Sequence, residues 1–174
     1  MAEGNWDLSG RIEGAKPPTI IGLELEVIRI VESTPRHFLF LSEKAWGGYF
    51  HWFGRSLRCD YPAECKRCTT SRKKWRGYIH ALEFLSTTKK EVIIELTQVA
   101  LVMIDLQLAT QPMRGAQFKI AKTKGGKHGR FVIEALPKRV SGTTLPDAKN
   151  IGSTVESLWK INEAWSGSTP EDSI

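Results

Sequence analysis

The sequence predicts a mainly β protein: a small Greek-key barrel of five to six strands with one helix, a metal-binding insertion loop and a short C-terminal helix. Three observations support this fold class. Several segments of strand length alternate apolar and polar residues, one helical segment lies between the third and fourth main strands, and a cysteine-containing stretch lacks periodicity. A chain of 174 residues suits one domain of ordinary size. We expect that domain over 19–137, with the insertion at about 51–74.

The first two strands are predicted near the N-terminal end of this domain. Residues 20–31 alternate apolar and charged side chains, which predicts a long strand with one solvated face. Its buried face is expected to carry Leu23, Leu25 and Val27. Residues 37–41 predict a second strand, which we expect to pair with the first as a hairpin.

Aromatic residues mark the next two strand-like segments. Residues 49–53 predict a short strand, and the stretch from 54 to 74 shows no periodicity. Alternation resumes over 75–85, with Tyr78 and His80 on one face of the predicted strand. The residues expected on the other face are Ile79, Ala81 and Glu83.

One helix is predicted in the second half of the domain. The β-branched run within 91–96 favours a strand, and Thr97 is a suitable N-cap for a helix over about 98–109. We expect its buried stripe to be Val99, Met103 and Leu106. A closing hairpin is predicted over 113–123 and 130–136.

The remaining segments are predicted to flank the domain. They are a flexible lead-in over 1–18, a linker over 138–152, a short helix over 153–165 with Ser153 in a capping box, and an acidic disordered tail over 166–174. Within the domain, one helix between the third and fourth main strands is the arrangement of the oligonucleotide-binding (OB) barrel.

The cysteines and one histidine have the spacing of a metal site. His51, Cys59, Cys65 and Cys68 form the pattern H-x7-C-x5-C-x2-C. A C-x2-C pair places two thiolates at adjacent corners of a tetrahedron, and a third cysteine with a histidine completes a closed Cys3His site, which suits Zn²⁺. The segment around them has little apolar material for a core, so a structural zinc would supply folding free energy.

Two points about this site stay open in the sequence. The fourth ligand is expected to be His51, but His80 and His37 are alternatives. Three unrelated thiols, or a redox pair at Cys65 and Cys68, are the other interpretations of the cysteines.

The sequence favours no enzyme class. A zinc deaminase needs H-x-E before its cysteines, and His51 is followed by Trp52 and Phe53. The sequence also has no P-loop, no G-x-S-x-G and no H-E-x-x-H. We therefore expect a protein without catalytic residues.

The positive charge lies in the middle of the chain. The formal net charge is +6, but residues 35–140 hold 20 basic and 8 acidic residues, a net +12, whereas 1–34 and 141–174 are each −3. A basic body with acidic ends predicts a partner that is a polyanion.

Aromatic and basic residues alternate on both sides of the cysteines. Single-stranded nucleic acid is bound by cations that follow the phosphates and by rings that stack on unpaired bases. The residues predicted for such contacts are Trp46, Trp52, Arg55, Arg58, Lys66, Arg67, Arg72, Lys73, Lys74, Trp75, Arg76 and Tyr78. Among them, Trp46, Trp52, Trp75 and Tyr78 are the rings expected on the solvated face. The closing hairpin adds Lys119, Lys122, Lys124, Lys127 and Arg130.

With these features the chain resembles the zinc-containing, helix-destabilising single-stranded-DNA-binding proteins of phages. The resemblance rests on strand order and on ligands in the order His, Cys, Cys, Cys, and it covers about residues 20–137. It implies an OB-fold with a zinc subdomain and an acidic C-terminal tail that recruits replication proteins. Here the ligand spacings are shorter and the tail is only weakly acidic.

The sequence thus predicts a non-enzymatic protein that binds single-stranded nucleic acid, with DNA favoured, in replication, recombination or repair. An RNA-binding or translation-associated protein is one alternative. A zinc-stabilised adaptor that docks through Trp159 and Trp165 is another. No apolar run approaches about 18 residues, and the N-terminus lacks a basic segment before an apolar one, so we expect a cytoplasmic protein, nucleoid-associated or in an infected cell.

Overall fold

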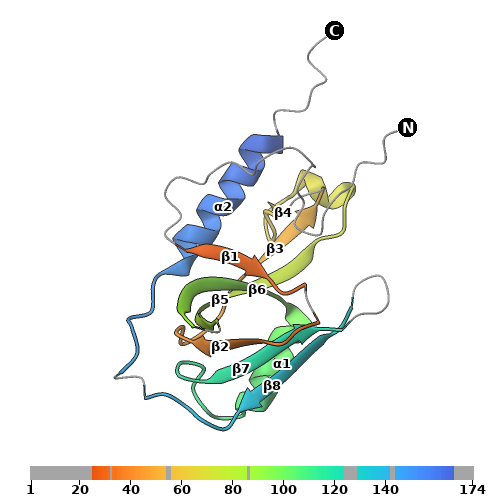
Figure 1. The fold of residues 1–174 in the computed structure, drawn as a ribbon. Coiled ribbons are helices and arrows are strands. Elements are labelled where there is room, and N and C mark those ends of the chain that lie inside the picture. The colour runs from red at the N-terminus through yellow and green to blue at the C-terminus, as the bar shows by residue number, and fades with distance from the viewer. Residues whose placement is uncertain are drawn as a thin grey trace, which may run out of the picture. The chain divides into compact units, whose positions relative to one another are not determined.

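A computed structural model describes residues 25–31, 33–53, 56–85, 87–123, 129–141 and 144–166 (Figure 1). The chain divides into two compact units. The larger unit comprises Leu25–Gly47 and Arg76–Ile151. The smaller unit includes Gly48–Trp75 and the chain from Gly152 onward. The mainly β class is confirmed, and so are a helix in the second half of the domain and a C-terminal helix.

The larger unit is organised around one mixed sheet. Its strands lie in the order β1-β6-β5-β2-β7-β8. Their bounds are β1 (Glu26–Arg29), β2 (Arg36–Phe40), β5 (Lys74–Phe84), β6 (Lys89–Thr97), β7 (Gln117–Lys122) and β8 (Phe131–Leu136). The β1–β6 pair is parallel, and the other pairs along this path are antiparallel.

Four of these strands have the Greek-key order. Along the chain these strands are β2, β5, β6 and β7. In the sheet their order is β7-β2-β5-β6, so the last of the four lies beside the first. The predicted closure into a barrel is not seen: in the described part of the chain, no pairing joins β8 to β1 or β6, so the sheet is open.

The prediction for the first strand was wrong in its partner and, from Val27 onward, in its buried face. β1 pairs with β6 and not with β2. Leu25 is buried as predicted, but Val27 is only half-buried, and the residues buried after it are Ile28 and Ile30. The apolar residues change from odd to even positions at Ile28, and Ile28 is aligned with Ile94 of β6, a core residue. Pairing with β6 therefore determines which face of β1 is buried, and the alternation of residues in β1 alone did not determine it. Leu23 lies outside the described residues.

The helix α1 (Gln98–Leu108) covers one face of the sheet and begins as predicted, because the Thr97 hydroxyl accepts a hydrogen bond from the amide of Ala100. Its buried residues are Ala100, Ile104 and Leu108. The predicted stripe was wrong: Val99 and Leu106 are 69% and 75% exposed, and Met103 is half-buried.

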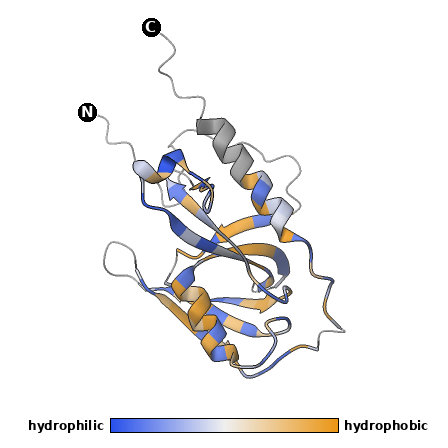
Figure 2. Ribbon diagram, turned by 180° about the vertical axis from the view of Figure 1, so that it is seen from behind, coloured by the Kyte–Doolittle hydropathy of each residue, from blue (hydrophilic) through white to orange (hydrophobic). Residues whose placement is uncertain are grey.

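The reason for this error lies in the composition of the helix. Asp105 is its one charged residue, and Figure 2 shows the helix coloured largely as hydrophobic. When apolar residues occupy almost every position, their spacing does not distinguish the buried face from the exposed one. The three large side chains left exposed are Val99, Val102 and Leu106.

Aromatic rings fill the centre of the core beneath α1. Phe40 and Phe118 are fully buried and stacked, with ring centroids 5.0 Å apart.

The predicted strand over 75–85 corresponds to β5, but the middle of this strand has no solvated face, since Tyr78, Ile79, His80 and Ala81 are all fully buried. The closing hairpin is confirmed as β7 and β8.

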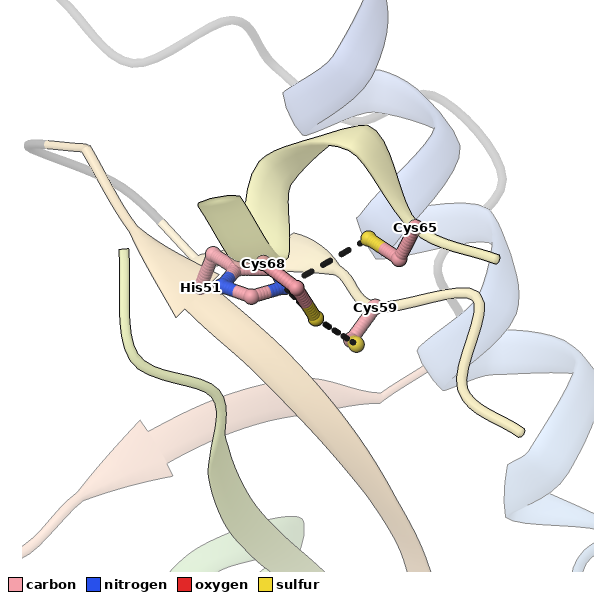
Figure 3. A group of neighbouring side chains, drawn as sticks. All are labelled: His51, Cys59, Cys65 and Cys68. Atoms are coloured by element: carbon pink, nitrogen blue, oxygen red, sulfur yellow. Dashed lines mark hydrogen bonds between the residues drawn. The ribbon is translucent and has the colours of Figure 1, made fainter. Parts of the chain in front are cut away.

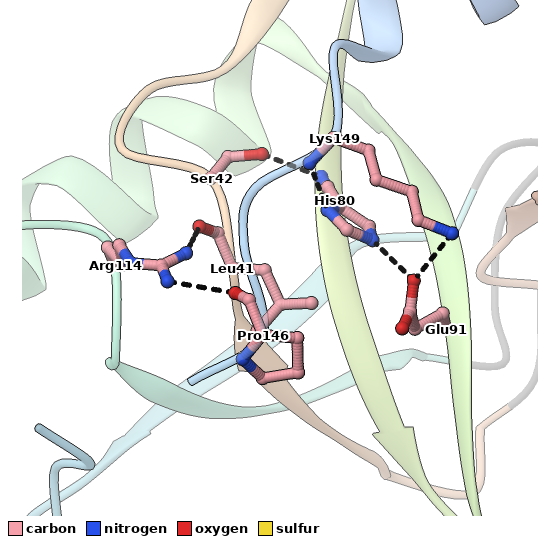
Figure 4. Close-up of polar contacts among 7 residues, drawn as sticks. All are labelled: Leu41, Ser42, His80, Glu91, Arg114, Pro146 and Lys149. Atoms are coloured by element: carbon pink, nitrogen blue, oxygen red, sulfur yellow. Dashed lines mark hydrogen bonds and ion pairs between the residues drawn. The ribbon is translucent and has the colours of Figure 1, made fainter. Parts of the chain in front are cut away.

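A return segment follows β8 and is held by the turn before β7. Arg114 donates hydrogen bonds to the carbonyls of Leu41, at 2.5 Å, and Pro146, at 2.8 Å (Figure 4). Gly115 has φ +82°, and a Cβ there would meet the carbonyl oxygen of Val140 at 2.2 Å, so only glycine fits. The predicted linker is thus anchored to the larger unit.

The C-terminal helix α2 (Ile151–Ser166) begins before the predicted start. Ser153 therefore lies inside the helix and is not its cap. The predictions for 1–18, for the tail after Ser166 and for the side chains of Trp159 and Trp165 lie outside what the structure describes. No helix among the described residues is long and apolar enough to cross a membrane.

Candidate metal centre

The smaller unit places four side chains around one point. β3 (Trp46–Trp52) and β4 (Ser56–Arg58) form an antiparallel hairpin in which His51 is aligned with Leu57. The hairpin contact continues past β4, because the amide of Cys59 donates to the carbonyl of Tyr49 at 2.9 Å. Cys65 and Cys68 come from a 3₁₀ turn over Lys66–Thr69, in which the amide of Cys68 donates to the carbonyl of Cys65.

Three of the distances between the ligand atoms of these four residues are close to those of a tetrahedral zinc site. All four lie within 4.8 Å of one another. Nε2 of His51 is 3.5 Å from Sγ of Cys65 and 3.5 Å from Sγ of Cys68, and the sulfurs of Cys59 and Cys68 are 3.6 Å apart (Figure 3). A tetrahedral zinc bound at ordinary lengths separates two sulfurs by about 3.8 Å, and a sulfur from an imidazole nitrogen by about 3.5 Å. The cluster therefore has room for one ion at its centre.

Burial of the cluster also fits a bound cation. His51 is fully buried, Cys59 and Cys65 are buried, and Cys68 is exposed. Nδ1 of His51 has no hydrogen-bond partner among the described residues. The other ring nitrogen, Nε2, is directed at the thiols of Cys65 and Cys68, so it is the nitrogen that a metal ion at the centre of the cluster would bind.

The two cysteines of the turn have opposite pKa shifts. Hydrogen bonds to the backbone of Asp60 and Arg67, and to His51, lower the pKa of Cys65 from 9.0 to about 6. Loss of solvation and the two neighbouring thiols raise the pKa of Cys68 to about 11. A divalent cation bound at the cluster would lower the pKa of Cys68 instead, because it stabilises thiolates directly. Three thiolates and one imidazole fill a tetrahedral shell, which is the composition of a structural zinc site.

Of the three candidate histidines, His51 lies with the cysteines in the described cluster. Nε2 of His37 lies 2.8 Å from Oε1 of Gln117. His80 is fully buried in the larger unit, where its Nδ1 accepts from the amide of Lys149 at 3.2 Å and its Nε2 faces Glu91 at 3.3 Å (Figure 4). Neither belongs to the described cluster that could hold an ion.

The residues predicted for nucleic-acid contacts differ in their exposure in the structure. Those exposed in the smaller unit are Trp52, Arg58, Lys66, Arg72 and Lys74. Those half-buried are Trp46, Arg67, Lys73, Trp75, Arg76 and Lys122. Lys119 and Arg130 are exposed on the larger unit, and Arg55, Lys124 and Lys127 lie outside the described residues.

One member of the prediction is wrong. Tyr78 is fully buried, and its hydroxyl donates to the carboxylate of Glu95 at 3.3 Å, so it cannot stack on a base. Arg76 also lies 3.3 Å from that carboxylate, and Trp46 packs against Tyr78 with ring centroids 6.0 Å apart. Periodicity assigned Tyr78 to a solvated face, but both faces of β5 are covered at this point.

Sequence reasoning missed two exposed rings beside the metal centre. Tyr61 and Phe53 are 51% and 44% exposed. Nζ of Lys73 lies 3.0 Å from the ring centroid of Tyr61 and 5.1 Å from that of Tyr49. The position of Tyr61 between two ligands, on a segment too short to build a core, was the available signal.

Comparison with known proteins gives no relative: no protein-family model matches the chain, and no curated protein or solved structure matches it either.

Proposed function

We propose that the protein binds single-stranded nucleic acid, with DNA favoured, and that it has no catalytic activity of its own. The observation that carries the proposal is the combination of exposed aromatic rings and cations on the smaller unit. Trp52 is 41% exposed, and Phe53 and Tyr61 are exposed to a similar extent. Large rings left in water within a short segment are typical of a ligand surface. Stacking of unpaired bases on such rings contributes about 1–3 kcal/mol per base.

The charge around these rings supports a phosphate ligand. Residues 48–75 contain seven basic and two acidic residues. Lys73, whose ammonium lies over Tyr61, places a cation directly beside a stacking surface. Such a pair can contact a base and its adjoining phosphate together, and the phosphate part weakens as salt rises.

The metal centre has a positioning role in this proposal. A zinc held by His51, Cys59, Cys65 and Cys68 would join β3, β4 and the 3₁₀ turn at one point. Trp52 directly follows His51, and Tyr61 lies between Cys59 and Cys65. The ion would therefore fix the backbone next to both rings without requiring either ring to be buried.

The strand order is consistent with an open form of the OB type. β2, β5 and β6 form a meander, α1 follows β6, and β7 returns beside β2 with β8 after it. This order resembles the OB sequence of elements, with β3 and β4 inserted between β2 and β5 and with β1 as the parallel neighbour of β6, and it supports the proposal. We propose a role in replication, recombination or repair on this basis, with replication or recombination proteins contacting the C-terminal tail.

A fluorescence-anisotropy titration of labelled oligo-dT at low and high salt tests the proposal. We expect binding that weakens steeply with salt, little binding to duplex DNA, and weaker competition by poly-U than by poly-dT. Trp52→Leu and Tyr61→Leu should each weaken binding by about 5- to 150-fold, whereas Tyr78→Phe, at the buried ring, should not. The absence of binding to any single strand at low salt would refute the proposal, and stronger competition by poly-U would favour the RNA-binding alternative.

A protein-interaction adaptor is the second candidate function. The exposed stripe of Val99, Val102 and Leu106 on α1 favours it, because an apolar helix face is normally covered. The sequence placed the docking surface of an adaptor at Trp159 and Trp165, whose side chains are not described. In the structure, the stripe on α1 is the surface that would dock. The adaptor becomes the better explanation if the titration detects no nucleic acid.

A further inference from the structure

Four side chains form a line across four adjacent strands of the larger unit. The pairings place Lys119 of β7 opposite His37 of β2, His37 opposite Phe84 of β5, and Phe84 opposite Lys89 of β6. Directly opposed residues of neighbouring strands point to the same face of a sheet. The four residues, which we call the aromatic row, therefore lie side by side over a span of about 14 Å, or three strand spacings.

The aromatic row lies on the sheet face opposite α1. Phe38 and Phe118, which follow His37 and precede Lys119 in their strands, belong to the core cluster that contains Ala100 and Ile104 of the helix. Since successive side chains of a strand alternate faces, the aromatic row points away from that core. Lys89 and Lys119 are exposed, and His37 and Phe84 are half-buried.

The two rings of the row are stacked. Their centroids are 4.4 Å apart, and their planes differ by 20°. On the ring of Phe84, the ammonium of Lys89 lies 5.1 Å from the centroid. A flexible, exposed lysine thus occupies the position where a further flat ring would extend the stack.

The histidine ring is held in place by a chain of hydrogen bonds. Gln117 is buried, and its amide NH₂ donates to the carbonyl of Lys138 at 3.1 Å. The amide oxygen of Gln117 is therefore an acceptor, and Nε2 of His37 donates to it at 2.8 Å. Because the ring is fixed before any ligand arrives, little side-chain entropy is lost when a base stacks on the pair.

We propose that the aromatic row is a second contact site for single-stranded nucleic acid, in which a base extends the His37–Phe84 stack and Lys89 and Lys119 bind phosphates. The inference rests on the proposed function and adds a site on the larger unit to that on the smaller one. On binding, the ammonium of Lys89 leaves the ring of Phe84 and pairs with a phosphate of the incoming strand. The row thus offers a stacking surface for a base with a cation at each end, and a basic surface beside stacking rings is how proteins bind single strands.

The test uses the full-length, zinc-loaded protein and an oligo-dT in which single thymines are replaced by photoreactive 5-iodouracil. We expect crosslinks to peptides that contain His37 or Phe84, besides those in residues 48–75. Phe84→Leu should weaken binding by about 5- to 150-fold. Lys89→Gln should lower the slope of log affinity against log salt by about one.

A neighbouring lysine provides the matched control. Lys90 follows Lys89 in β6, points to the other face and is paired with Glu26. Lys90→Gln should therefore leave the salt slope unchanged. Wild-type affinity of Phe84→Leu, together with crosslinks confined to residues 48–75, would overturn this inference and leave the proposed function intact. Absence of binding by the wild-type protein would overturn both. If Phe84→Leu fails to fold, equal salt slopes for Lys89→Gln and Lys90→Gln would refute the proposal that the aromatic row is a contact site.

Discussion

Removal of the metal is expected to unfold the smaller unit while the larger unit stays folded. The hydrophobic core cluster consists entirely of residues from the larger unit, such as Phe38, Ile94 and Ile104. In the smaller unit, the large side chains fully or nearly fully buried within residues 48–75 are Phe50, His51 and Leu57, besides two of the cysteines. Two apolar side chains and a histidine are a small core for this segment, so a bound metal would contribute most of its stability.

The expected effect is large. Structural zinc sites contribute about 10–16 kcal/mol of apparent binding free energy near neutral pH. If half of the lower figure stabilises local structure, chelation removes about 5 kcal/mol, which corresponds to more than about a thousandfold faster opening of the protected amides. The amides affected are those of Cys59, which donates to Tyr49, and Cys68, which donates to Cys65.

Hydrogen–deuterium exchange followed by mass spectrometry measures this effect directly. Peptides from residues 56–75 should lose protection when zinc is removed by a chelator, and peptides from β7 and α1 should keep it. Protection should return when one equivalent of zinc is added. Unchanged exchange in residues 56–75 would refute the metal centre, and simultaneous loss of protection in both units would refute their independence.

Three further predictions test individual residues. Metal analysis should find about one zinc per chain, and His51→Gln should lower zinc affinity, whereas His37→Gln and His80→Gln should not. In α1, Ile104→Ala should reduce the free energy of unfolding by about 2–5 kcal/mol, because it creates a cavity, while Leu106→Ala should change it by less than about 0.5 kcal/mol; equal effects would contradict the observed helix orientation. Burial lowers the pKa of His80 below 6.5, so the unfolded chain binds this proton more readily. Stability should therefore be constant above about pH 6.5 and fall as the pH drops below it, and thermal unfolding of wild type and His80→Gln across this range should show a weaker dependence in the variant.

The sequence predicted the elements of the fold better than their partners. Local signals identified β5, β6 and the cap at Thr97, because each depends on neighbouring residues. The partner of β1 depends on contacts with β6, more than 60 positions away, and no local pattern encodes it. The exposed face of α1 was mispredicted for a related reason, since an almost uniformly apolar helix contains no periodic contrast.

The clustering of the four candidate metal ligands could be predicted because their chemistry is local and uncommon. Cysteines at C-x2-C spacing have few alternative roles, and the upstream histidine lies on the strand that reaches them. The binding surface was harder to predict, because an aromatic residue in a strand has the same pattern whether its face is solvated or covered. Tyr78 of β5 and Trp52 of β3 show both outcomes: the first is fully buried, and the second is 41% exposed.

The candidate metal centre offers a reason why aromatic rings of the smaller unit can remain exposed. In a unit of this size without a metal, rings such as Trp52 and Tyr61 would have to be buried, because apolar burial is the main source of folding free energy. A metal ion bound by the four candidate ligands would supply that free energy from a different interaction. The rings would then be available to a ligand, and the adjoining cations, among them Lys73, would remain on a backbone that the ion holds in place. On this argument, replacing the metal centre by a compact apolar core would preserve the fold of the unit only by burying the rings, and it would therefore abolish binding of single strands at this surface.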